Sequence, residues 1–227
     1  MDLLEFARGP GLAISFAVFV LGVLWRLIAI LRLPPLRDLS PAREGAPSRA
    51  AGALQAIGRG FWPRREFGGT AVLSSLNSYV FHIGLAIIAF GYAPHIAFIR
   101  RVSGLHWPAL PDVVIYLAAG ATICTLGLAL WARLTQPVLR RISRADDYIT
   151  WTITFLPIVT GMAVMMEPSA GVLARDAVVY RTPLAVHLLT LELMLIWFPF
   201  GKLMHAFLFF FSRGATGIRF SHRGVEV

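Results

Sequence analysis

Cysteine, lysine and charge are scarce in this chain. Its 227 residues include one cysteine, Cys124, and one lysine, Lys202, and only 15% of the residues are charged. A single cysteine cannot ligate an iron–sulfur cluster or close an internal disulfide, so any cluster that works with this chain belongs to another polypeptide. Glycine-rich phosphate loops, nucleophile elbows and cysteine pairs are also missing, so nothing indicates phosphate binding, hydrolysis or nucleophilic catalysis.

Hydrophobic residues, in contrast, make up 57% of the chain, and the mean hydropathy is +0.69. About 20 apolar residues cross the roughly 30 Å hydrocarbon layer as a helix, which satisfies its backbone hydrogen bonds internally. The sequence therefore predicts an all-α integral membrane protein with five transmembrane helices, and the first helix lacks the small-residue cleavage site of a removed signal peptide. The five runs are 12–31, 72–99, 113–131, 148–166 and 183–211.

The polar segments between these runs suggest four parts. We expect a first transmembrane helix over 1–32, an arginine-rich cytoplasmic loop over 33–70, a four-helix transmembrane core over 71–212 and a cytoplasmic tail over 213–227. The loop contains five prolines and a stretch, 51–59, that predicts a short surface helix.

Basic residues predict the orientation in the membrane. The formal charge is +9, and twenty arginines supply nearly all of the positive charge. Fourteen basic residues fall in the first loop, the third loop and the tail, whereas five fall on the opposite side. Because basic residues are retained on the cytoplasmic face, we expect an inner-membrane protein with its amino terminus outside and its carboxyl terminus in the cytoplasm. No nucleic-acid motif accompanies the arginines.

Four of the six histidines lie in the second and fifth spans. Ionisable residues at membrane depth are costly and mark functional sites, although a single histidine also serves as a hydrogen-bonded packing residue. A haem with two axial histidines needs one imidazole on each side of the ring at matched depth. The antiparallel spans pair His82 with His205 near the cytoplasm and His95 with His187 near the outside. The pattern predicts two b-type haems between spans two and five.

Helical spacing supports one half of this arrangement better than the other. His187 and His205 are 18 residues apart, five full turns of a straight helix with a rise of about 27 Å, and so share a face. His82 and His95 are 13 residues apart, which turns their side chains about 140° away from each other. A kink at Pro94 would re-aim His95. Glycines in the second span, Gly84 and Gly91, admit either a flat macrocycle or close helix packing.

The second and fifth spans also carry a family resemblance. The segment 81–84 (Phe-His-Ile-Gly), His187 and the segment 198–205 (Phe-Pro-Phe-Gly-Lys-Leu-Met-His) resemble the gamma subunit of respiratory nitrate reductase and related cytochromes of sulfur-metabolising membrane complexes. The resemblance implies a five-helix bundle with two b haems. It also implies quinol oxidation near the outer haem and electron transfer to a cytoplasmic iron–sulfur subunit.

Two departures from that family affect individual residues. The family's second histidine in span two follows the glycine at Gly91 directly, where this chain has Tyr92, and His95 lies one turn further on. Histidine suits a low-spin electron carrier better than tyrosine does, so His95 is the better candidate ligand. Nitrate reductase members carry a lysine near the start of span three, where this chain reads 112–116 (Asp-Val-Val-Ile-Tyr). These differences favour a relative that serves another catalytic partner.

We therefore expect the electron-transfer subunit of an oxidoreductase complex, a membrane cytochrome b that links the quinone pool to cytoplasmic iron–sulfur and catalytic subunits and anchors them. Residues near the outer end are quinone-site candidates: Tyr92, Arg100, Glu167 and Tyr180. Glu192 serves either as a proton acceptor or as a buried structural acid. Three alternatives stay open: one haem on His82 and His205, a haem-free transporter or proton conductor that uses the histidines as relays, and a passive anchor.

Overall fold

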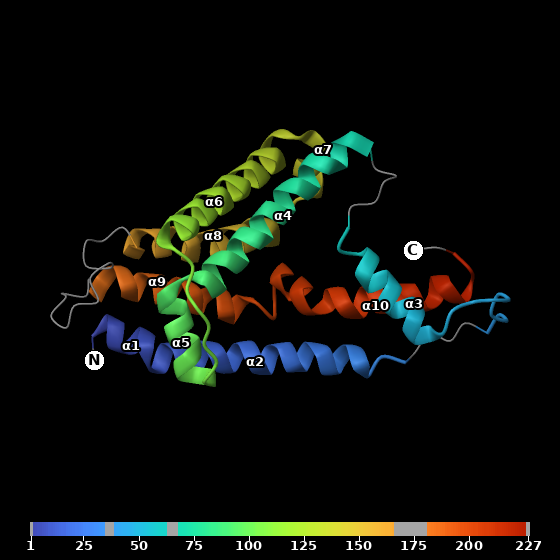
Figure 1. Cartoon of the computed structure of the whole chain (residues 1–227), viewed down its shortest axis with the longest axis horizontal. Coiled ribbons are helices and arrows are strands. Elements are labelled where there is room, and N and C mark those ends of the chain that lie inside the picture. The colour runs from blue at the N-terminus through green and yellow to red at the C-terminus, as the bar shows by residue number, and fades with distance from the viewer. Residues whose placement is uncertain (1, 35–38, 63–67, 166–180, 226–227) are drawn as a thin grey trace.

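The structure is a computed structural model that describes residues 2–34, 39–62, 68–165 and 181–225. The regular secondary structure in these ranges is helical, and α2, α8 and α9 run along the longest axis of the molecule (Figure 1). The helices are α1 (Leu3–Arg8), α2 (Pro10–Leu31), α3 (Arg49–Arg59), α4 (Gly68–Gly91), α5 (Ala93–Ser103), α6 (Asp112–Thr135), α7 (Pro137–Ile142), α8 (Ala145–Met165), α9 (Arg181–Trp197), the short 3-10 helix η2 (Lys202–Met204) and α10 (His205–His222).

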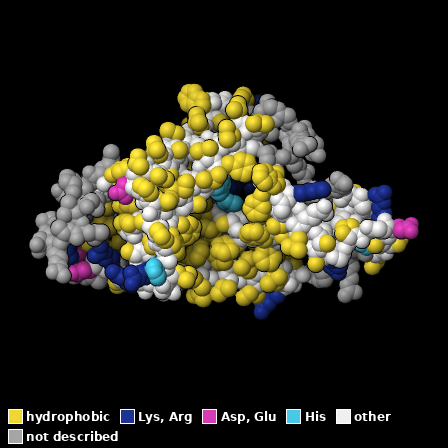
Figure 2. All heavy atoms as spheres, viewed as in Figure 1, with side chains coloured by type: hydrophobic (Ala, Val, Ile, Leu, Met, Phe, Trp, Pro, Cys, Tyr) yellow, Lys and Arg dark blue, Asp and Glu magenta, His cyan; other side chains and the backbone are white. Residues whose placement is uncertain are grey.

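Several helices have the length and composition of membrane spans. Four segments are long and apolar enough to cross a bilayer: Leu3–Leu31, Val72–Gly91, Asp112–Thr135 and Ala145–Met165. The pair α9 and α10 also passes this test, with a bend of 73° at the break between its helices. The described residues thus hold four such spans, or five if the bent pair crosses once. Hydrophobic side chains cover the middle of the molecule, and basic ones gather toward its two ends (Figure 2).

The long helices pack one on the next. α4 lies against α6, α6 against α8, α8 against α9, and α9 against both α1 and α2. At the N-terminal end, Arg181 at the start of α9 forms ion pairs with Asp2 and Glu5. The backbone N–H of Glu5 holds the pKa of Asp2 below its usual value, so Asp2 stays anionic for this contact. This end of the bundle therefore has α1, α2 and α9 tied together.

The second span is shorter than the sequence predicts. α4 ends at Gly91, and Tyr92 has an extended conformation before α5 begins, with Pro94 in its first turn. Proline fits the first helical turn, where its missing N–H would have no partner, so Pro94 favours the start of a new helix here. Residues 72–99 thus form two helices in place of one, and α5 turns away from the axis of α4 (Figure 1).

The fifth span is also broken, which corrects the expectation of one straight helix over 183–211. α9 ends at Trp197, and the chain passes through Pro199 and Gly201 before η2 and α10 begin. Proline disfavours continuation of an α-helix because its ring clashes with the preceding turn and it has no N–H. Trp197 accepts hydrogen bonds from the N–H groups of Phe200 and Gly201 instead. The five-turn relation between His187 and His205 therefore does not hold.

The predicted surface helix in the first loop is present as α3. Ser48 caps its start by accepting a hydrogen bond from the Ala51 N–H. α3 packs along α10 beyond the end of the bundle (Figure 1). At the crossing, a Cβ on Gly217 would lie 2.3 Å from the carbonyl oxygen of Gly52, so the two backbones are in direct contact.

Glycines in the second span serve helix packing. A Cβ on Gly84 would lie 2.2 Å from Oγ1 of Thr122 in α6, and one on Gly91 would lie 2.7 Å from Leu110. Both positions are therefore filled by protein, and small residues here allow helices to approach closely. Of the two interpretations left open by the sequence, the structure supports close helix packing at these two positions.

Candidate functional site

Two pairs of histidines approach each other across the bundle. The ring centres of His82 and His205 are 6.1 Å apart, with their planes nearly perpendicular at 88°. The ring centres of His95 and His187 are 6.3 Å apart, with their planes nearly parallel at 15°. These are the two pairs expected from the sequence, although both spans are broken.

The separation within each pair suits one metal between two imidazoles. A metal–imidazole bond is about 2 Å long and the ring centre lies about 1 Å beyond the nitrogen, so two opposed rings have centres about 6 Å apart. The described residues contain no cluster of three or more histidine, cysteine, aspartate or glutamate side chains suited to a metal ion. Two imidazoles fit an iron whose remaining ligands come from a porphyrin.

Hydrogen bonds orient three of these imidazoles through the same ring nitrogen. Nδ1 lies 2.7 Å from the Ser78 carbonyl oxygen in His82, 2.9 Å from that of Ile88 in His95, and 2.8 Å from that of Lys202 in His205. A carbonyl can only accept, so Nδ1 carries the proton and donates it, and Nε2 keeps its lone pair. Histidines that bind metals are held in this way.

His95 has a second role at the end of α4. The last four carbonyl groups of a helix lack partners within the helix. The side chains of His95 and Trp107 donate to the carbonyls of Ile88 and Phe90, and the Leu110 N–H donates to that of Gly91. The break after Gly91 thus supplies the acceptor that orients His95. This explains how His95 reaches His187 despite the unfavourable spacing from His82.

His187 is positioned by α8. Thr160 Oγ1 donates to the Leu156 carbonyl at 2.7 Å and lies 3.3 Å from Nδ1 of His187, where it can accept the imidazole proton. A Cβ on Gly161 would lie 3.0 Å from Cε1 of the same ring. A glycine at this position therefore leaves room for the imidazole between α8 and α9.

His205 is positioned by an ion-pair network at the break of the last span. Lys202 accepts the His205 hydrogen bond through its carbonyl and contacts Asp147 through its ammonium group. Asp147, with a side chain only 6% exposed, also pairs with Arg133 at 3.0 Å and accepts from the Arg144 N–H at 2.9 Å. The network joins α6, α8 and η2 next to the imidazole.

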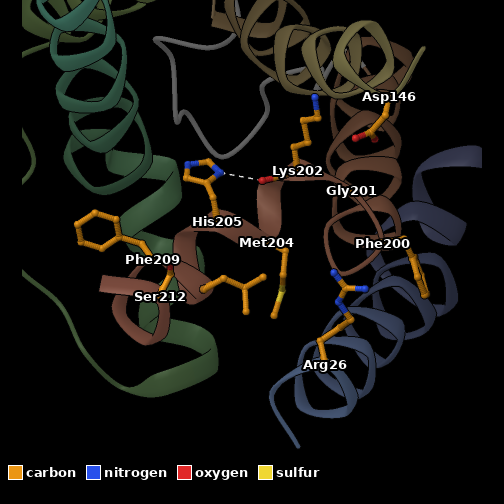
Figure 3. A pocket seen from close by; sticks show the side chains of 10 residues that line it. Arg26, Asp146, Phe200, Gly201, Lys202, Met204, His205, Phe209 and Ser212 are labelled. Atoms are coloured by element: carbon orange, nitrogen blue, oxygen red, sulfur yellow. Dashed lines mark hydrogen bonds between the residues drawn. The ribbon is translucent and has the colours of Figure 1, made fainter. Parts of the chain in front are cut away.

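A cavity of about 700 Å³ adjoins His205. It is lined by Arg26 from α2, Asp146 from α8, the segment around Gly201 and Lys202, and the first turns of α10 (Figure 3). Cofactor sites commonly have volumes of about 300–1,000 Å³ with a mainly apolar lining and a few polar groups. Arg26 and Lys202 supply positive charge beside the apolar rings of Phe200 and Phe209. The Asp146 carboxylate adds a negative charge, and His82 does not line the cavity, so the cavity lies beside the imidazole pair.

The predicted quinone-site residues have different positions. The Tyr92 ring packs perpendicular to that of His95, with ring centres 5.3 Å apart. Arg100 is exposed in the last turn of α5, away from the imidazole pair. Glu167 and Tyr180 lie outside the described residues. Of the four candidates, the structure brings Tyr92 to the histidine pair.

Several site residues were not predicted from the sequence. Thr160, Gly161 and Asp147 position imidazoles through contacts that span 26 to 55 residues, and neither composition nor periodicity indicates such contacts. Asp147 did carry a usable signal, because a buried acid in the first turn of an apolar helix needs a basic partner. Lys202 lies in the segment 198–205 that carries the family resemblance, but nothing in that segment indicates an ion pair with Asp147.

Comparisons with known proteins give one relative. A protein of Nitratidesulfovibrio vulgaris, whose name states no function, is 29% identical over 224 residues. The likeness covers 95% of this chain and 92% of the relative. No protein-family model matches the chain, and no solved structure matches it.

Proposed function

We propose that this chain is a membrane cytochrome b with two haems, held by His82 with His205 and by His95 with His187. The observation that carries the proposal is the geometry of the two imidazole pairs. Each pair has the separation of two ligands on one metal, and three of the four rings donate through Nδ1 and so present a free Nε2. Bound haem would supply one-electron carriers at two depths of the membrane.

The residues of the chain hold and orient the two ligand sets. In one set, α4 supplies His82 and α10 supplies His205. In the other set, α5 supplies His95 and α9 supplies His187. Lys202, anchored on Asp147, fixes the orientation of His205, and Arg26 offers positive charge to carboxylates beside it. Thr160 accepts from His187, and the end of α4 accepts from His95. The two sets thus have separate supports.

The proposed physiological role is electron transfer between a membrane quinone and cytoplasmic iron–sulfur and catalytic subunits, which the chain also anchors. The single cysteine supports a cluster on another polypeptide. Tyr92 beside His95 supports a quinone site at the N-terminal end of the bundle. The arginines of α3 and α10 support a partner or anionic lipid at the opposite end. In this proposal the N-terminal end faces the outside.

A reduced-minus-oxidised absorption spectrum with pyridine haemochrome counting tests this function. We expect b-type bands and two haems per purified chain. Replacing His82 or His205 by alanine should remove one haem, and replacing His95 or His187 should remove the other. His222→Ala is the matched control, because His222 uses Nε2 to bond the Ser40 carbonyl at 2.9 Å.

Three outcomes would contradict the proposal in different ways. A colourless chain would favour a haem-free transporter or a passive anchor. One haem that depends only on His82 and His205 would establish the mono-haem alternative. Full pigment in a variant that lacks both His187 and His205 would show that haem binds elsewhere.

A further inference from the structure

Glu192 is a buried acid that the proposed haem ligation does not use. It lies in the middle of α9, its side chain is only 5% exposed, and Oε1 is buried with no hydrogen-bond partner. An ionised carboxylate without a partner is strongly disfavoured in an apolar environment. Glu192 must therefore bind a proton or have a nearby positive charge.

α2 provides a niche for this side chain. A Cβ on Gly11 would lie 2.6 Å from Oε2 of Glu192 and 3.1 Å from the carboxyl carbon. One turn further along the same face of α2, Ser15 is fully buried and its hydroxyl donates to the Leu12 carbonyl at 3.0 Å. The carboxyl group is thus enclosed between α2 and α9, away from the described cavity beside His205.

Charged groups on the packed helices are remote from Glu192 or are engaged elsewhere. None of the basic side chains in the described part of the chain forms an ion pair with it. Arg8 is exposed, Arg181 pairs with Asp2 and Glu5, and Arg26 lies about four turns beyond Gly11. Among the described residues, the remaining titratable groups near these helices are few. Asp2 and Glu5 lie at the start of α1, and His187 lies on α9. Asp146, Asp147 and Tyr148 lie in the first turn of α8.

We propose that Glu192 takes up one proton when the haem held by His95 and His187 is reduced, and releases it on reoxidation. This inference rests on the proposed function. His187 is five residues before Glu192, about 7.5 Å along the axis of α9 and about 140° around it. Oxidised haem iron contributes a positive charge that stabilises the carboxylate. One electron from the quinol removes that charge, and one proton from the aqueous phase converts the carboxylate to a neutral carboxylic acid, so the local charge is unchanged.

Redox-difference infrared spectra of the full-length chain in lipid vesicles test this inference. We expect a carbonyl band of a protonated carboxyl group in the reduced state, sensitive to deuterium exchange and absent in Glu192→Gln. Glutamine has the shape of the neutral acid, so this variant should retain both haems. The exposed Glu5→Gln variant is the matched control and should keep the band. The midpoint potential of this haem should fall with rising pH in the wild type and lose that dependence in Glu192→Gln.

The outcomes separate this inference from the function on which it rests. A chain without haem absorption overturns the proposed function. A normal two-haem spectrum with an unchanged infrared band in Glu192→Gln overturns the assignment of Glu192 alone. A normal spectrum whose potential does not vary with pH, with no carboxyl band on reduction, also overturns it.

Discussion

Asp147 shows how a residue outside the imidazole pairs can affect one of them. It contacts Lys202 and Arg133, and the Lys202 carbonyl accepts from His205. In Asp147→Asn, both basic groups lose a charged partner. Hydrogen bonds to charged groups contribute about 1.5–3 kcal/mol to the free energy of unfolding. We expect Asp147→Asn to lower that free energy by about 1–2 kcal/mol, because Lys202 and Arg133 are partly exposed to solvent.

The expected result is a change in the His82–His205 centre alone. Low-temperature spectra and redox titration of Asp147→Asn should show an altered line shape and potential for one haem and an unchanged second haem. Glu44→Gln removes the same charge from an exposed position outside this network and this cavity, and should resemble the wild type. Equal changes in both haems would contradict a local positioning role.

Gly161 should affect the other pair. In Gly161→Val the added side chain must displace the His187 ring, because even a Cβ would lie 3.0 Å from it. We expect the haem content to fall toward one per chain, with the remaining haem dependent on His82 and His205. Gly127→Val is the matched control, because a Cβ on Gly127 meets open space. Two haems in Gly161→Val would show that this glycine does not determine the ligand position.

At the scale of single helices, the sequence predicted where the spans lie better than how they end. Apolar runs define the spans because lipid selects composition over some 20 residues. The breaks at Tyr92 and at Pro199 depend on a few local residues, and neither shortens the apolar run. The pairing of histidines by depth survived both breaks, whereas the five-turn argument for His187 and His205 did not. The supports Thr160 and Asp147 come from other helices, and one sequence does not reveal such contacts.

The packing of α3 on α10 yields a prediction for these two helices. Valine at Gly217 would overlap the Gly52 backbone, and overpacking of this kind typically costs about 1–3 kcal/mol. We expect α3 to separate from α10 and to lose helical structure in Gly217→Val, so that trypsin cleaves faster after Arg49 and Arg59, which are exposed but held in a helix in the wild type. Gly58→Val changes α3 where a Cβ meets no neighbour, and it should be cleaved as slowly as the wild type. Equal cleavage of both variants would contradict this interface.

At the scale of the whole molecule, the bent pair decides the topology. If α9 and α10 cross the membrane once, the described spans make five crossings and the two termini lie on opposite sides. If the pair enters and leaves on the same side, the termini share a side. We expect opposite sides, with the carboxyl terminus in the cytoplasm, because basic residues concentrate near α3, α7 and α10.

Reporter fusions at each terminus measure this directly. A reporter that is active only in the cytoplasm should report at the carboxyl terminus and be silent at the amino terminus, and a reporter active only outside should give the reverse pattern. Activity of one reporter at both termini would support a re-entrant α9–α10 pair. Fusions after Thr135, between α6 and α7, give an internal reference, which should match the carboxyl terminus.

The 73° bend in the last span separates the supports of His187 from those of His205. His187 and His205 belong to two helices with different axes, each fixed by its own neighbours. In a straight helix, a rotation that moved one imidazole would also move the other. In the proposed di-haem protein, a substitution on one half of the divided span would therefore change the potential of one haem alone, and with it the difference in potential between the two haems.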